Sequence, residues 1–307
     1  MIWLTILLCF IWGFNFIIMK IALDYFPPVL FSTLRFLLGA SFLLIICFYK
    51  KIPLPRKKDW KWYALCGVLQ TSYVFIVNQQ ALQYLDAGLT SLLVYTMPIW
   101  FAVLAHCFIG ERLTSPKIFA LVLGLIGLFL VLKINPLQFK WYGIALLAQL
   151  FVLSGAAAWA ISNIIVKKFL DNHDKWQFTA YQMVIGALVL FLYSFLFEKG
   201  QTITWSWEAI IILLYSGIIA SSFAFVLWFY LLGSGEGGKA SLSLLLVPAV
   251  SILFGVILLD ETMGLTTIIG IIVILIAIGL INIKQNRLPS TNFESQVENH
   301  INQKSIH

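Results

Sequence analysis

Charged residues are scarce in this sequence: only 11% of its 307 residues are Asp, Glu, Lys or Arg, against about 25% in a typical soluble domain. Hydrophobic residues make up 61% of the chain, and its mean hydropathy is +0.95. This composition excludes an ordinary water-soluble domain and favours a chain that lies in lipid. The apolar runs are continuous and about 20 residues long, which suits helices that span a bilayer and excludes the alternating strands of a membrane β-barrel.

Residues that carry enzyme chemistry are also few. The sequence has no H-E-x-x-H, G-x-S-x-G or Walker motif, and none of its 13 Asp and Glu residues falls inside an expected helix. Its four cysteines lie in expected helices without a C-x-x-C pair, so we interpret them as packing residues rather than metal ligands or disulfides. We therefore expect no enzyme activity, no metal site and no cofactor.

The apolar runs predict an all-α polytopic membrane protein with ten transmembrane helices. Their expected ranges are Ile2–Ile21, Val29–Tyr49, Trp62–Gln83, Ala87–Ile109, Lys117–Leu132, Gly143–Val166, Phe178–Phe197, Ala209–Leu232, Lys239–Leu259 and Leu265–Ile283. The polar segment 284–307 has too few apolar residues to bury a core, so we expect a disordered cytoplasmic tail there.

The net charge of +7 is distributed unevenly between alternate loops. The densest basic cluster, KKIPLPRKKDWK at residues 50–61, lies between the second and third expected helices. Because basic loops resist translocation, this pattern places both termini in the cytoplasm. We therefore expect a lipid bilayer, and not nucleic acid, around the basic residues.

One sequence phrase occurs twice: WGFNFIIMK at residues 12–20 returns as WAISNIIVK at residues 159–167, an offset of 147. This offset and, further on, an offset of 150 pair distinctive residues: Arg35 with Gln182, Pro98 with Pro248, and Glu111 with Glu261. Each copy holds five expected spans, and five is odd, so the second copy must enter the membrane from the opposite side. The sequence thus predicts two inverted five-helix repeats, residues 1–134 and 135–283, which allow alternating access to a site between them.

The inverted arrangement also predicts where two acidic residues lie. Glu111 is expected at the cytoplasmic end of the fourth span, and Glu261 at the outer end of the ninth.

These features resemble the EamA-type branch of the drug/metabolite transporter superfamily. The resemblance rests on ten spans in two halves, Arg35-Phe36 early in the second span, Pro98 in mid-span and GERLT at residues 110–114. It implies a bacterial inner-membrane carrier that exports amino acids and related metabolites through a central cavity between the halves. The second half departs from the pattern, because Gln182 stands in place of Arg and Asp260-Glu261 in place of Gly-Glu. Any anion preference is therefore expected to be one-sided.

Polar and aromatic side chains at cavity depth are candidates for substrate binding. They are Trp12, Asn15, Arg35, Tyr73, Gln80, Tyr95, Trp100, Trp159, Asn163, Gln182 and Trp228. An amide beside an indole on one helix face, as with Trp12 and Asn15, suits an amphipathic metabolite. Arg35 is a charge deep in its span and suits a carboxylate or phosphate. The alternatives are hydrogen bonds between helices for the polar residues and, for Arg35, a side chain that reaches the outer interface.

Pro98 and Pro248 are candidate hinges, because a proline in mid-helix removes a backbone N–H and kinks the helix; the alternative is a static kink. We expect a secondary transporter that exports small amphipathic metabolites, such as amino acids, by alternating access. Its expected partners are a small-molecule substrate and the bilayer, and nothing in the sequence indicates an oligomeric state. A channel-like facilitator, or a membrane-embedded sensor without a transport cycle, is the alternative.

Overall fold

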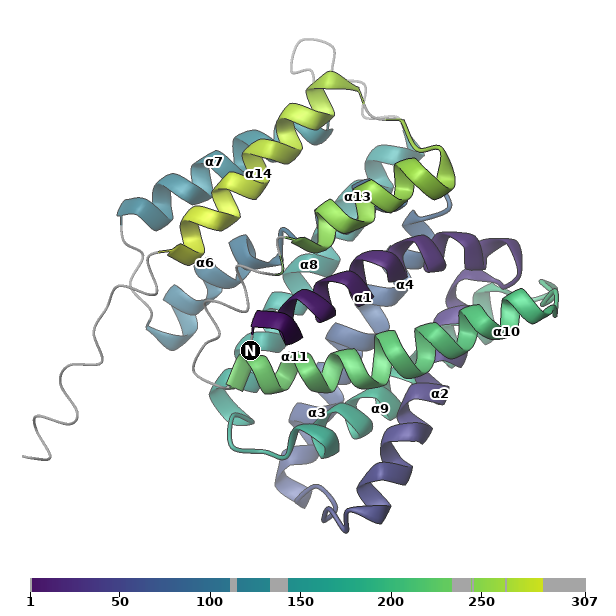
Figure 1. Cartoon of the computed structure of the whole chain (residues 1–307). Coiled ribbons are helices and arrows are strands. Elements are labelled where there is room, and N and C mark those ends of the chain that lie inside the picture. Colours follow the sequence, from purple (N-terminus) through teal and green to yellow (C-terminus); the bar gives the residue numbers. More distant parts are fainter. Residues whose placement is uncertain are drawn as a thin grey trace, which may run out of the picture.

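The computed structural model describes residues 2–110, 115–132, 143–233, 244, 246–262 and 264–283. Within these ranges all the regular elements are helices, and no strand is present (Figure 1). Glu111 and the expected tail at 284–307 lie outside the described residues.

Helices lie in all ten of the ranges expected from the sequence. They are α1 (Ile2–Ile21), α2 (Pro28–Tyr49), α3 (Trp60–Cys66), η3 (Gly67–Tyr73), α4 (Val74–Ala81), α5 (Ala87–Val94), α6 (Met97–Ile109), α7 (Ser115–Leu132), α8 (Ile144–Phe169), α9 (Lys175–Phe197), α10 (Trp207–Leu214), η4 (Tyr215–Phe223), α11 (Ala224–Gly233), α13 (Leu246–Leu259) and α14 (Leu265–Ile283). In the described part of the chain, six helical stretches are long and apolar enough to cross a membrane, and one of them, Ala87–Ile109, comprises α5 and α6. These lengths and compositions are those of a multi-pass membrane protein.

Helix ends are fixed by residues both near and far in the sequence. Asp174 accepts a hydrogen bond from Gln177 N (2.8 Å) at the start of α9, as an N-cap residue does. The start of α2 has no such local cap. Its Val29 and Leu30 N–H groups instead donate to the Glu198 carboxylate, at 2.7 and 2.8 Å, so the end of α9 holds the beginning of α2.

Two helices that the sequence predicts to be continuous contain π-helical segments, η3 and η4. They correspond to each other at the offset of 150. Ser72 Oγ donates to Gly186 O on α9 (2.9 Å) and lies 3.2 Å from Gly67 O, five residues earlier. Such a hydroxyl competes for backbone carbonyls and favours a local change in the helix.

The contacts of η4 repeat those of η3. Ser222 Oγ donates to Gly39 O on α2 (2.9 Å) and lies 3.0 Å from Gly217 O. A Cβ atom at Gly39 would lie 2.7 Å from Gly217 O, and one at Gly186 would lie 2.8 Å from Gly67 O. Only glycine allows backbones this close, so α2 crosses η4, and α9 crosses η3, glycine against glycine.

The fourth expected span is broken in the middle. It ends as α5 at Val94 and restarts as α6 at Met97, with Pro98 in the first turn of α6. Pro98 has no N–H to donate to Val94 O, and the next N–H, that of Ile99, bonds Thr96 O, three residues earlier, at 2.8 Å. The sequence predicted a kink here, whereas the structure has a break. Pro248 lies in the first turn of α13, and residues 234–243 and 245 before that helix are outside the described part.

α7 and α14 lie side by side at one edge of the bundle (Figure 1). They interlock where a Cβ atom at Gly127 would meet Gly270 O at 2.9 Å. Their main contact with the remaining helices is through α6.

Candidate functional site

A small cavity lies among α1, α2, α4, α5, α8 and α11. Five of the eleven substrate-binding candidates line it: Trp12, Asn15, Arg35, Tyr95 and Trp159. The rest of its wall consists of Phe16, Met19, Val74, Phe75, Asn78, Val94 and Phe225. The volume of the cavity, measured as the space open to the centres of water molecules, is about 30 Å³, which is enough for about two waters.

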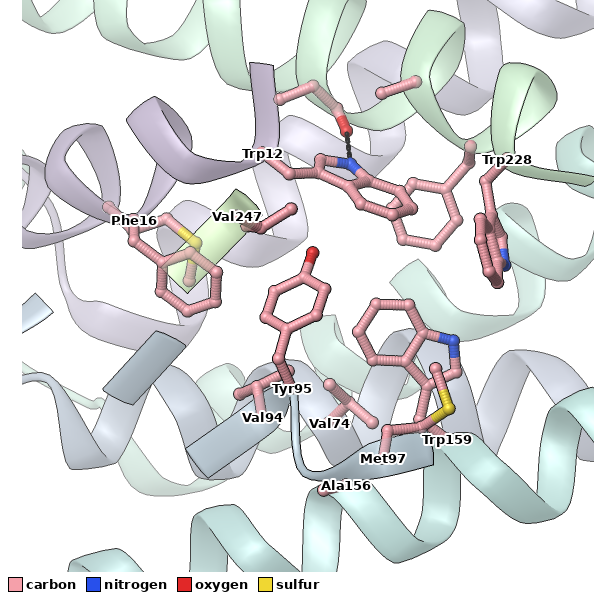
Figure 2. Packing of buried hydrophobic residues seen from close by; sticks show 14 of the residues in the cluster. Trp12, Phe16, Val74, Val94, Tyr95, Met97, Ala156, Trp159, Trp228 and Val247 are labelled. Carbon is pink, nitrogen blue, oxygen red and sulfur yellow. Dashed lines mark hydrogen bonds between the residues drawn. The ribbon is translucent and has the colours of Figure 1, made fainter. Parts of the chain in front are cut away.

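Aromatic rings from both halves of the chain meet at this cavity (Figure 2). The Trp12 and Trp159 rings lie edge to face with their centroids 5.9 Å apart, and Tyr95 lies 6.1 Å from Trp159. Trp12 also contacts Phe225 at 5.5 Å and Trp228 at 6.0 Å. Edge-to-face contacts of this kind stabilise a buried aromatic cluster.

The three tryptophans of this cluster, Trp12, Trp159 and Trp228, differ in the hydrogen bonds of their indole N–H groups. Trp12 Nε1 donates to Ala220 O at 3.1 Å, the dashed line in Figure 2. The Trp159 and Trp228 Nε1 atoms are buried without a partner among the described residues. Trp159 lines the cavity, and its Nε1 has no acceptor among the described residues.

Arg35 is the cation of the cavity wall, and its side chain is only 1% exposed. Its Nε donates to Ser221 Oγ (3.0 Å), and its guanidinium carbon lies 5.0 Å from the ring centroids of both Phe36 and Phe75. In the described part of the chain, Nη1 has no hydrogen-bond partner and no carboxylate pairs with the group. A buried guanidinium that keeps an unpartnered N–H and has no carboxylate beside it can bind an anion.

Two amides add polar groups to the wall. Asn15 Oδ1 accepts from Ser216 Oγ at 3.1 Å. Asn78 is 2% exposed, and its Oδ1 has no donor among the described residues. Asn78 was not among the sequence candidates.

Asn78 escaped the sequence pattern because of η3. Placing Tyr73 and Gln80 on one helix face assumes a constant turn of 3.6 residues. A π-helical turn adds one residue and rotates the following helix by about 100°. The rotation brings Asn78 to the cavity. Gln80 lies partly exposed, where it accepts from Gln83 Nε2. A serine and a glycine five residues apart, as in Gly67 and Ser72, is the signal that could have shown this shift.

The remaining candidates lie outside the cavity wall and contact other side chains. Tyr73 OH bonds Ser154 Oγ (2.7 Å), Trp100 Nε1 donates to Thr96 Oγ1 (3.3 Å), Asn163 Nδ2 donates to Met97 Sδ (3.5 Å), Gln182 Oε1 accepts from Thr71 Oγ1 (2.9 Å), and Trp228 packs on Trp12. The candidate hinges Pro98 and Pro248 are both buried.

A charged cluster joins the end of α13 to the start of α5. The Glu261 carboxylate, 8% exposed, accepts hydrogen bonds from Ala87 N and from Gly88 N (3.1 Å), so it caps α5 from a distance. Burial raises the pKa of the Glu261 carboxyl, and the two N–H donors oppose this shift. Lys20 Nζ donates to Leu85 O (2.8 Å) beyond the end of α4.

The chain matches the model of the EamA-like transporter family over residues 1–133 and 146–283. It is 33% identical to the uncharacterized transporter YoaV of Bacillus subtilis over 265 residues, which covers 86% of this chain and 90% of that protein. It is 27% identical to a probable amino-acid metabolite efflux pump of Salmonella typhimurium (89% and 91% covered) and 25% identical to one of Escherichia coli (89% and 91%).

A crystal structure that is 16% identical in sequence superposes with a TM-score of 0.65 and covers 90% of this chain and 98% of its own. That likeness supports the fold. The family match extends over both halves of the chain, including the helices that build the aromatic cavity and carry Arg35. The chain belongs to the EamA-like transporter family.

Proposed function

We propose that the protein is a secondary transporter of the cell membrane that exports small amphipathic metabolites with a carboxylate, such as amino acids, by alternating access. The observation that carries this proposal is the Arg35 guanidinium, buried in the cavity wall with Nη1 unpartnered in the described part of the chain. Two relatives named as probable amino-acid metabolite efflux pumps support the direction and the substrate class.

The cavity offers complementary groups to each part of such a substrate. Arg35 can take the carboxylate through charge-assisted hydrogen bonds. The free Asn78 Oδ1 can accept from an ammonium or hydroxyl group, and the Trp12 and Trp159 rings can cover an apolar part or a cation. The described wall contains no Asp or Glu, so the site favours substrates that carry a negative group.

The inverted repeat is part of this proposal, and repeated contacts support it. The Ser72–Gly186 and Ser222–Gly39 hydrogen bonds correspond at the offsets of 147 and 150. Trp12 and Trp159, equivalent at the offset of 147, touch each other. An axis in the membrane plane that exchanges the halves would produce both kinds of contact.

Contacts between loops support the proposed orientation of the ten spans. Thr204 N donates to Tyr25 O (2.8 Å), which joins the α9–α10 and α1–α2 connections. His173 Nε2 lies 3.0 Å from Asp59 Oδ2, which joins the α8–α9 and α2–α3 connections. With both termini in the cytoplasm, ten alternating spans place the first pair of connections on the extracellular side of the membrane and the second pair on the cytoplasmic side.

Transport through this cavity requires its wall to move. Room for about two water molecules is too small for an amino acid, so the described conformation must open to admit one. The break between α5 and α6 at Pro98 and the start of α13 at Pro248 give two helices points at which to bend. We propose these prolines as the hinges.

A counterflow experiment tests the function. The purified protein is reconstituted in lipid vesicles, and the vesicles are loaded with each of the twenty amino acids in turn. Uptake of the same amino acid, labelled and added outside, is then followed. We expect saturable uptake of at least one amino acid, and a strong loss of it in Arg35→Gln, which introduces the residue found at position 182. Lys57→Gln, which removes an exposed charge, is the matched control and keeps the wild-type rate.

Three results would overturn parts of the proposal. The absence of uptake for every amino acid would remove this substrate class. Uptake that does not saturate would indicate a channel-like facilitator. An unchanged rate in Arg35→Gln would remove Arg35 from the site.

A further inference from the structure

Two side-chain hydrogen bonds occupy equivalent places in the two halves but differ in charge. On one side, Arg35 Nε on α2 donates to Ser221 Oγ on η4 at 3.0 Å. On the other side, Thr71 Oγ1 on η3 donates to Gln182 Oε1 on α9 at 2.9 Å. The offset of 147 pairs residue 35 with 182, and the offset of 150 pairs residue 71 with 221.

The Ser221 hydroxyl is oriented by a neighbour in its own segment. Its hydrogen goes to Ser216 O, 2.7 Å away and five residues earlier in η4. A hydroxyl has one hydrogen, so the oxygen lone pairs remain for Arg35 Nε. Ser216 in turn donates from Oγ to Asn15 Oδ1 (3.1 Å), and both serines are fully buried. The acceptor that Arg35 meets is therefore fixed by the π-helical turn.

Ser221 and two rings together set the orientation of the guanidinium. Phe36 and Phe75 lie at 5.0 Å from its central carbon, and Ser221 holds its Nε edge. The Nη1 atom has no partner among the described residues, although the group lines the cavity. Because the fork of donors is planar, fixing the Nε edge also fixes where the remaining donors point.

The equivalent contact in the other half involves no charged group. Thr71 uses its hydrogen on the Gln182 amide oxygen, and neither side chain carries a charge. Cys66, the counterpart of Ser216, makes only a long contact of its Sγ with Ser162 O (3.9 Å). The two contacts are alike in geometry, so they provide an internal comparison between a charged and a neutral version.

We infer that Ser221 is a positioning residue, which holds Arg35 so that the unpartnered Nη1 is available to a molecule in the cavity. We also infer that recognition of a substrate carboxylate depends on this contact and not on the equivalent Thr71–Gln182 contact. The inference rests on the proposed function, because it assumes that Arg35 binds the carboxylate of the transported molecule.

The test compares Ser221→Ala with Thr71→Ala in vesicles. For every amino acid that the wild type carries, the half-saturation concentration is measured for the amino acid and for its C-terminal amide, which lacks the carboxylate. We expect Ser221→Ala to raise the value for the amino acid by about tenfold or more, as for loss of a hydrogen bond to a charged group, and to leave the value for the amide unchanged. Thr71→Ala should change both values by less than about twofold, since it alters no charged group.

Conservative variants separate positioning from folding. Ser221→Thr keeps the hydroxyl and should restore the wild-type value, and threonine is the natural residue at the equivalent position 71. Ser221→Cys keeps the size but offers only a weak acceptor, so it should raise the half-saturation concentration for the amino acid in the same way. It takes the place of Ser221→Ala if the alanine variant does not fold.

Each outcome decides a different point. If the wild type carries no amino acid, the proposed function fails and the inference fails with it. If transport occurs but Ser221→Ala and Thr71→Ala have the same effect, or if the amide is affected as strongly as the amino acid, only the inference is overturned.

Discussion

Trp12 and Trp159 meet edge to face in the wall of the cavity, with ring centroids 5.9 Å apart (Figure 2). The two residues are equivalent at the offset of 147, so each half contributes the same side chain to the contact. Their indole N–H groups nevertheless differ, since Trp12 donates to Ala220 O and Trp159 has no acceptor in the described part of the chain. The contact is thus alike in position and unlike in chemistry.

This difference predicts unequal effects of the same substitution. Trp12→Phe and Trp159→Phe remove the same volume, but only the first removes a hydrogen bond, which is worth about 1 kcal/mol. We expect Trp12→Phe to lower the free energy of unfolding in detergent by about this amount more than Trp159→Phe does. Equal losses in the two variants would contradict the assignment of the hydrogen bond.

The glycine crossings predict large effects of a single methyl group. Gly39→Ala and Gly186→Ala place a Cβ atom against a backbone carbonyl at 2.7 and 2.8 Å, so the helices must separate. Overpacking of this kind costs about 1–3 kcal/mol, and we expect both variants to melt at lower temperature. Gly143→Ala is the control, because a Cβ atom there meets nothing within 4 Å. Melting temperatures of Gly39→Ala and Gly143→Ala that do not differ would contradict the close approach.

The break at Pro98 predicts a change in turnover rather than in binding. Pro98→Ala restores an N–H that can bond Val94 O, so the helix can continue through the break and become stiffer. We expect vesicle uptake with a lower maximal rate and an unchanged half-saturation concentration. Pro28→Ala, at the first position of α2, should leave both values unchanged, since proline is well suited to that position. A normal maximal rate in Pro98→Ala would indicate a static break.

Glu261 predicts a pH dependence of stability. Burial raises its pKa in the folded protein, so its contribution to stability is complete below the ordinary Glu pKa of about 4.3 and is lost as pH rises through the raised value. Glu261→Gln cannot ionise, so we expect the wild type to lose more melting temperature than this variant between about pH 4 and pH 7. Glu261→Ala leaves two N–H groups of α5 unpaired and should be less stable at every pH. Parallel pH profiles of the wild type and Glu261→Gln would contradict this role.

The proposed orientation predicts which loops face the cell exterior. Cys107 is the exposed cysteine among the described residues, so the test uses a Cys107→Ser background, in which Cys9, Cys47 and Cys66 are buried. In intact cells, a membrane-impermeant maleimide should label Gln201→Cys and not Lys57→Cys. Labelling of Lys57→Cys should require permeabilised cells. Equal labelling of both positions in intact cells would overturn the inverted repeat and, with it, the alternating-access proposal.

Much of the helical framework could be predicted from the sequence because the bilayer sets the length of the apolar runs. The ranges Ile2–Ile21 and Leu265–Ile283 coincide with α1 and α14. The π-helical segments could not be predicted in the same way, because each depends on one serine hydroxyl and on a carbonyl more than 100 residues away. The break at Pro98 could not be predicted either, since the sequence shows the proline but not whether the helix bends or stops there.

The repeat located the centre of the candidate site better than helical periodicity did. Trp12 and Trp159 stand out as rare residues at a fixed offset, and both line the cavity. Asn78 has no such mark, and η3 shifts its helix face by one residue. Arg35 could be identified as a buried charge, but the serine that orients it lies 186 residues away and is one of many polar residues in the second half.

The pairing of α7 with α14 separates two surfaces of the protein. None of the described residues that line the cavity belongs to either helix, and the pair reaches the other helices mainly through α6. Exchange of one apolar residue for another on this pair alters how the protein meets the surrounding lipid and leaves its ligand chemistry intact. Among relatives that carry the same cargo in membranes of different thickness, we therefore expect divergence to accumulate first on these two helices.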